Sequence, residues 1–116
     1  MNASSEWVRV GALSDVPRRG ARCVLTEVGR IAVFRTSDDA VYALEDRCPH
    51  RGGPLSQGIV HGTSVTCPLH NWQIDLADGT ALGADEGKVR SFAIRVEDGC
   101  LWLRRADLLA AVGLAA

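Results

Sequence analysis

The chain has 116 residues, of which 47% are hydrophobic and 23% charged, and its formal net charge is −1. This length suits one domain with a single modest core. The near-neutral charge excludes a general attraction to nucleic acid or to an anionic membrane. The sequence contains neither an apolar run long enough to span a membrane nor a secretory leader pattern. We therefore expect a cytoplasmic protein.

The first half of the chain alternates short apolar runs with turn residues, which predicts β-strands joined by tight turns. The runs are residues 7–10, 22–26, 30–35 and 40–45. Turns are predicted at residues 27–29 and 37–39, which are rich in glycine, serine and aspartate. Residues 13–16, just before Pro17, predict one helical turn.

The second half repeats this pattern and ends in a helical segment. Its strand-like runs are residues 64–66, 73–76, 92–96 and 100–103. Asp98-Gly99 lies between the last two runs and is a strong hairpin signal. Residues 107–114 have helical spacing but are too few to form a stable helix alone, so we expect them to pack on the body as a cap. The pattern predicts an all-β fold of small sheets with a short C-terminal helix.

A loop-rich insertion is expected in the middle of this single domain, which spans residues 1–116. Two prolines and three glycines fall within residues 47–58, a composition that excludes a central strand. Glycine also lets the backbone approach another group closely. We place the insertion at about residues 46–72, the base at about residues 6–45 and 73–104, and the tail at 105–116.

Two short motifs in this insertion each pair a cysteine with a histidine. Cys48-Pro49-His50 is followed, after sixteen residues, by Cys67-Pro68-Leu69-His70. Two ordered pairs, each with a proline after the cysteine, are hard to produce by chance. Thiolate and imidazole both bind zinc and iron. These four side chains are therefore predicted to hold a metal centre.

The residues alone leave more than one metal possible. Two cysteines and two histidines can close a tetrahedral zinc site, although such sites usually keep like ligands together along the chain. A two-iron cluster can use mixed pairs, because one iron can take both cysteines and the other both histidines. Two disulfides would need an oxidising compartment, which nothing in the sequence supports. We expect Cys23 and Cys100, which lie in apolar runs, to be buried thiols.

Both motifs resemble the two cluster-binding boxes of Rieske domains. The likeness is carried by Cys-Pro-His-Arg-Gly at residues 48–52 and Cys-Pro-Leu-His-Asn-Trp at residues 67–72. It continues through residues 74–79 and the last hairpin at 95–99. The resemblance implies the Rieske fold, an antiparallel β-sandwich base with an inserted cluster-binding subdomain of two loops.

The resemblance also implies a Rieske-type [2Fe–2S] cluster and its ligands. Cys48 and Cys67 would bind one iron, and His50 and His70 would bind the other. The residues expected around these ligands are Arg51, Gly52, Leu69 and Trp72, with Pro54 and Leu55 as further candidates for shielding the cluster. His61 lies in an expected surface turn and is assigned no role.

Two absences predict a low reduction potential for such a cluster. Some Rieske domains join their two boxes by a disulfide, whose cysteines would fall here at Gly53 and Leu69. The hydroxyl donors that raise the potential in those domains are not evident at residues 71–73, Asn-Trp-Gln. We therefore expect a midpoint near the bottom of the Rieske range, which is roughly −150 to +300 mV.

The sequence has no nucleotide-binding fingerprint and no nucleophile–base motif, so we expect an electron-transfer protein that is not catalytic alone. Residues 42–47, 52–56 and 82–87 resemble small subunits of assimilatory NAD(P)H-dependent nitrite reductases. That resemblance implies a large-subunit partner with FAD, an iron–sulfur cluster and sirohaem. The alternative is the ferredoxin component of a ring-hydroxylating dioxygenase, which works between a reductase and an oxygenase. A subunit whose cluster is purely structural is a third possibility.

Overall fold

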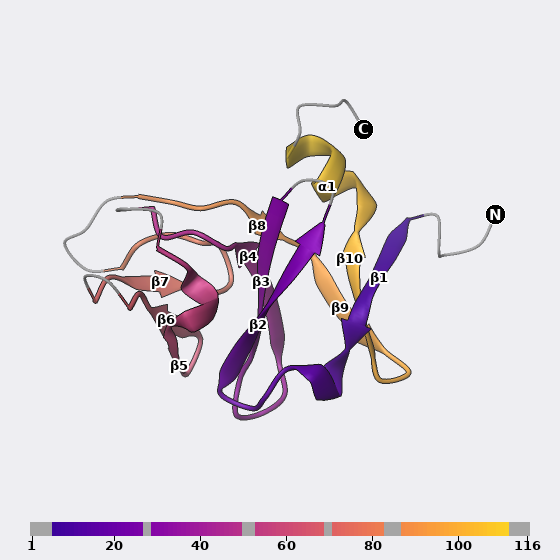
Figure 1. Cartoon of the computed structure of the whole chain (residues 1–116), viewed down its shortest axis with the longest axis horizontal. Helices are drawn as coiled ribbons and strands as arrows, with labels where there is room; N and C mark the ends of the chain where they lie inside the picture. Colours follow the sequence, from indigo (N-terminus) through magenta and orange to yellow (C-terminus); the bar gives the residue numbers. More distant parts are fainter. Residues whose placement is uncertain (1–5, 27–28, 50–52, 69–70, 83–86, 112–116) are drawn as a thin grey trace.

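The described part of the chain, residues 6–26, 29–49, 53–68, 71–82 and 87–111, forms three antiparallel sheets in the computed structural model (Figure 1). The outer sheet has the order β1 (Trp7–Ala12), β10 (Cys100–Arg104), β9 (Ile94–Glu97). The central sheet has the order β2 (Gly20–Thr26), β3 (Gly29–Arg35), β4 (Val41–Glu45), β8 (Ser91–Phe92). The small sheet has the order β5 (Ile59–His61), β6 (Ser64–Thr66), β7 (Gln73–Asp75). The predicted all-β class is confirmed.

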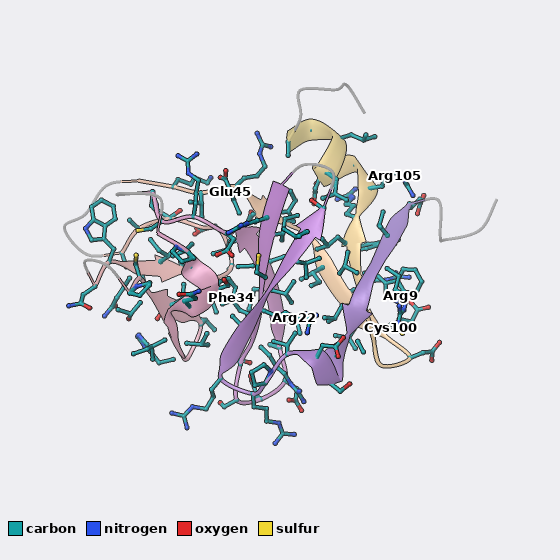
Figure 2. The ribbon with its side chains drawn as sticks, viewed as in Figure 1. Arg9, Arg22, Phe34, Glu45, Cys100 and Arg105 are labelled. Atoms are coloured by element: carbon teal, nitrogen blue, oxygen red, sulfur yellow. The ribbon has the colours of Figure 1, made fainter. Side chains whose placement is uncertain are left out.

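The central sheet lies between the other two and is covered on both faces (Figure 1). Successive side chains of a strand point to opposite faces. In β3, Ile31 and Val33 pack with residues of the outer sheet, whereas Ala32 and Phe34 pack with residues of the small sheet. Figure 2 shows Phe34 on the side of the central sheet that faces the small sheet. The unbroken apolar run in β3 is what a strand buried on both faces requires.

One predicted strand, residues 92–96, is two strands in two different sheets. β8 pairs with β4 in the central sheet, and β9 pairs with β10 in the outer sheet. Ala93 lies at the crossing, where its N–H donates to the Asp107 carboxylate at 2.7 Å. Its carbonyl accepts from the Arg104 N–H at 3.1 Å. The Asp107 side chain therefore satisfies a backbone group at the point where the chain changes sheets.

The structure also corrects element boundaries. The helix α1 is Arg105–Ala111, so it begins two residues before the predicted start, and residues 112–114 lie outside the described residues. His61, expected in a turn, is the exposed last residue of β5, and the turn follows at Gly62, where φ is +58°. β7 pairs with β6 in the small sheet. Alternation reveals a strand but not the sheet that it joins.

Other local expectations are confirmed. The helical turn expected at residues 13–16 is a 3₁₀ turn, Leu13–Asp15, whose Asp15 carboxylate accepts from the Ala12 N–H at 3.1 Å. Asp98-Gly99 forms the predicted hairpin, with both residues at positive φ. Within the residues that the structure describes, no helix has the length and apolar character needed to cross a membrane.

Replacing Phe34 tests the two-sided burial of the central sheet. Phe34 is fully buried, so Phe34→Ala should lower the free energy of unfolding by about 3–5 kcal/mol. Leu25 in the neighbouring strand is 77% exposed, so Leu25→Ala should change it by no more than about 0.5 kcal/mol. Urea denaturation followed by circular dichroism measures both values. Equal, small losses would contradict the assigned packing.

Candidate metal centre

Both motif cysteines are buried in the apolar layer between the central and small sheets. Cys48 and Cys67 are each 1% exposed. They belong to one cluster of buried residues, in which Phe34 comes from the central sheet and Val65 from the small sheet. Two residues that are nineteen positions apart in the sequence are thus held in one layer. None of the four cysteines of the chain is joined in a disulfide.

Each of the two cysteine loops is closed by an equivalent backbone hydrogen bond. The Cys48 N–H donates to the Gly53 carbonyl at 2.7 Å, and the Cys67 N–H donates to the Trp72 carbonyl at 2.7 Å. In both loops the acceptor lies five residues after the cysteine. In the second loop the Asn71 N–H also donates to the Cys67 carbonyl at 3.1 Å, with Asn71 at a φ of +59°. Two separate segments therefore present their cysteines on backbone loops of equal length.

Of the predicted residues around the site, only part lies in the described chain. Trp72 is half-buried and packs against the apolar layer that holds the cysteines, and Leu55 is fully buried in that layer. Pro54 is half-buried beside it. The other predicted site residues lie outside the described residues: His50, Arg51, Gly52, Leu69 and His70.

A third segment, described at residues 79–82 and 87–89, touches both cysteine loops. A methyl group at Gly87 would lie 2.9 Å from Cβ of Pro49 in the first loop and 3.4 Å from Cζ3 of Trp72 in the second. Backbone hydrogen bonds hold the segment in place, from Ala81 N–H to the Gly87 carbonyl at 2.9 Å and from Leu82 N–H to the Gln73 carbonyl at 2.8 Å. No local pattern in the sequence indicates a site role for this segment, because its contacts are long-range and a glycine carries no chemical signal.

The turn that leads into this segment is fixed by aspartate side chains. The Asp78 carboxylate accepts from the Thr80 N–H at 2.9 Å, and the Asp75 carboxylate accepts from the Ala77 N–H at 2.7 Å. Hydrogen bonds from the backbone and hydroxyl of Thr80 lower the pKa of Asp78. The carboxylate is thus stabilised in the ionised form that holds the turn.

A buried carboxylate at Asp46 braces the first cysteine loop from outside. Asp46 is 8% exposed and accepts hydrogen bonds from the Ser56 N–H at 2.8 Å and the Ser56 hydroxyl at 2.7 Å. It therefore joins the residues before and after Cys48. On β2, burial raises the pKa of the Cys23 thiol, and the hydrogen bond from that thiol to Asp46 raises it further.

The two cysteines outside the motifs differ from the expectation of fully buried thiols. Cys23 and Cys100 are only partly buried, and each has a polar partner. The Cys23 thiol interacts with Asp46, and the Cys100 sulfur accepts from Arg9 Nε at 3.3 Å. His61, in contrast, remains a surface residue, with its Nε2 2.8 Å from the Thr66 hydroxyl.

The described donor set suits a thiolate-bound metal. Apolar surroundings disfavour a bare thiolate, and a bound cation compensates that charge. Soft sulfur ligands select iron–sulfur clusters, zinc or Cu(I) over hard cations such as Mg²⁺. Cys48 and Cys67, buried in one layer and not joined in a disulfide, fit a centre of this kind.

Adding a methyl group at Gly87 should weaken this centre. Gly87→Ala forces Pro49 or Trp72 to move, which should cost about 1–3 kcal/mol of stability and accelerate metal loss to a chelator. Gly29→Ala is the matched control, because both glycines have a positive φ (157° and 116°) but Gly29 has nothing within 4 Å. Metal content by mass spectrometry, followed against time, compares the two variants. Equal rates of loss would show that the contact with the loops is unimportant.

Comparison with known proteins agrees with this geometry. The model of the Rieske-like [2Fe-2S] domain family matches residues 6–104. The anthranilate 1,2-dioxygenase ferredoxin subunit of Burkholderia cepacia is 34% identical over 96 residues, which cover 82% of this chain and 88% of that protein. The 4β-methylsterol monooxygenase of Methylococcus capsulatus is 36% identical over 87 residues, 66% of this chain but only 24% of the enzyme. The chain thus spans about a quarter of that relative.

Among solved structures, a Mycobacterium tuberculosis protein superposes with a TM-score of 0.77 and 27% identity, covering 85% of this chain and 94% of the other. Its assignment as an NADH-dependent nitrite reductase small subunit is itself provisional. A dioxygenase ferredoxin subunit and a nitrite reductase small subunit therefore both share this fold over most of their length. The family match, the sheets and the paired cysteine loops together identify this chain as a member of the Rieske-like [2Fe-2S] domain family, an electron-transfer protein whose cofactor is a Rieske [2Fe–2S] cluster.

Proposed function

We propose that this chain is the small subunit of an NAD(P)H-dependent nitrite reductase. The main support is the likeness to the mycobacterial protein, which extends over 94% of that chain. Residues 42–47, 52–56 and 82–87, which resemble such subunits, add to it. The partner is then a large subunit with FAD, an iron–sulfur cluster and sirohaem, on which nitrite is reduced to ammonium.

The proposed ligands are the two cysteines on one iron and the two motif histidines, His50 and His70, on the other. When bound, the cluster supplies one-electron transfer at a potential that depends on ligand charge, hydrogen bonding and solvent exposure. Replacing two thiolates by neutral imidazoles makes the centre easier to reduce. Cys48 and Cys67 hold the metal within the apolar layer described above.

The surrounding residues position the loops and limit access of water. Trp72 packs against the layer that holds both cysteines, and Gly87 brings the third segment against both loops. Asp46 and Ser56 keep the first loop closed from outside. These contacts would hold the two cysteine ligands in place when the cluster is bound.

A second function is supported by the Burkholderia cepacia relative. That protein is the ferredoxin subunit of anthranilate 1,2-dioxygenase and is more similar in sequence, 34%, than the mycobacterial protein, 27%. On this alternative, the chain would carry electrons from a reductase to an oxygenase. The fold and cluster would be the same, and only the partners would differ.

Reconstitution distinguishes the two functions. The holoprotein should bind the sirohaem-containing large subunit and increase NAD(P)H-dependent nitrite reduction, and it should not restore turnover to a dioxygenase lacking its ferredoxin. Cys67→Ser, which removes a ligand, should abolish the increase. The opposite pattern of partners would favour the ferredoxin function. Full nitrite reduction with Cys67→Ser would show that the cluster is only structural.

The midpoint potential should lie in the lower part of the Rieske range, below about +100 mV. The physical reason is the absence of a disulfide at the cysteine loops, where Gly53 stands in place of a cysteine. Redox titration monitored by electron paramagnetic resonance measures the potential, and the spectrum of the reduced protein distinguishes iron from zinc. A midpoint above about +100 mV, or a colourless protein with one zinc ion per chain, would contradict the assignment.

A further inference from the structure

The outer sheet has a face that no other described element covers, and its side chains are unusual for a solvent-exposed surface. Leu101 and Leu103 of β10 point into the core, so Trp102 and Arg104 point outward. The solvent face of an antiparallel sheet is normally polar. Here cross-strand pairing places Arg9 and Arg95 on either side of Trp102.

Trp7 completes this surface, since it pairs with Arg104 across the two strands. We call it the Trp–Arg face, and its members are Trp7, Arg9, Arg95, Trp102 and Arg104. Both tryptophans are half-buried. Trp and Arg are the residue types most enriched in the energetic centres of protein interfaces.

The face is organised before any partner binds. The Arg95 guanidinium carbon lies 4.6 Å from the centre of the Trp7 ring, which is a cation–π geometry. Because β10 separates their strands, Arg95 reaches across the sheet to make this contact. Its Nη2 also lies 2.7 Å from the Glu97 carboxylate. Side chains that are already ordered lose less entropy on binding.

The face has hydrogen-bond donors that the described residues do not satisfy. Arg9 and Arg104 form no ion pair among the described residues, and Arg9 Nε donates instead to the Cys100 sulfur at 3.3 Å. Trp102 Nε1 and Arg95 Nε are buried without an acceptor there.

Two acids near the face, Glu97 and Asp15, already have partners. Glu97 pairs with Arg95, and Asp15, whose charge also acts on Arg9, accepts from the Ala12 N–H. The guanidinium groups of Arg9 and Arg104 can therefore bind carboxylates of a partner.

The Trp–Arg face lies at the opposite side of the molecule from the metal centre. The outer sheet and the small sheet flank the central sheet, along the 45 Å axis of the molecule (Figure 1). Arg9 and Cys100 lie on the outer sheet away from the small sheet (Figure 2). A relay must exchange electrons with both a donor and an acceptor at its metal end. A partner that bound this chain through the Trp–Arg face would leave the opposite end, which carries the metal centre, accessible to both the electron donor and the electron acceptor.

We propose that the Trp–Arg face binds an acidic surface of the large partner subunit and anchors this chain to it. The proposal rests on the proposed function, because it assigns the contact by which a small subunit stays in its complex. Arg9 and Arg104 provide the charge, and the Trp7–Arg95 pair provides the ordered apolar centre. Anchoring raises the effective concentration of the metal end near its redox partners.

Charge reversal at the face tests the anchor. The double variant Arg9→Glu/Arg104→Glu, loaded with its cluster, should bind the cofactor-containing large subunit about tenfold or more weakly, and its binding should depend less on salt. Nitrite reduction at saturating small subunit should stay unchanged, because the metal end is intact. Arg9→Lys/Arg104→Lys should recover most of the affinity. An unchanged midpoint potential confirms that each variant is folded around its cluster.

The matched control is Arg19→Glu/Arg22→Glu, which changes the net charge equally at exposed residues outside the strands of the outer sheet. It should bind like the natural chain. If all double variants bind the large subunit as tightly as the natural chain, the anchor is refuted and the nitrite reductase function still stands. The same conclusion follows if the face instead joins two copies of this chain, in a dimer that dissociates only when the charges of the face are reversed. If the natural chain binds a dioxygenase component instead, the proposed function fails, and the anchor stands only if the same reversal weakens that binding. Binding to neither partner refutes both proposals.

Discussion

Cys48 and Cys67 can share one metal centre because an apolar layer between two sheets fixes both of their loops. Phe34 enters this layer from the central sheet, and the small sheet closes it from the other side. Each cysteine N–H is then committed to a carbonyl five residues further along. Burial thus sets where the sulfurs lie, and the backbone bonds set how they are presented. The surrounding contacts at Asp46 and Gly87 maintain this arrangement.

The sequence predicted features that depend on residues close together in the chain, but it did not predict contacts between residues far apart in the chain. Alternating apolar residues marked most strands, and the cysteine–histidine motifs indicated the proposed centre, because the cysteine and histidine of each pair are close in the chain. The sequence did not show that the strand is interrupted at Ala93, because the apolar alternation continues from β8 into β9 although the two strands join different sheets. For the same reason, alternation did not show which sheet β7 joins. The contact of Gly87 with Pro49 depends on folding of the whole subdomain, so no local pattern indicates it.

The family resemblance determines the chemistry more firmly than the physiological role. Ferredoxin subunits and nitrite reductase small subunits share this fold over most of their length. A shared scaffold supports different functions through the surfaces that it presents. In this chain electron transfer requires the cluster, whereas the arginines and half-buried tryptophans of the outer sheet can suit a particular partner.

The alternation of β3 has a consequence for redesign. Its odd-numbered positions, Ile31 and Val33, belong to the sandwich, and its even-numbered positions, Ala32 and Phe34, belong to the layer around the sulfurs. A single strand therefore offers two separate sets of sites. Substitutions in the first set would act on the stability of the sandwich away from the cofactor, whereas substitutions in the second set would change the surroundings of the cofactor and stability together, because Ala32 and Phe34 are themselves fully buried.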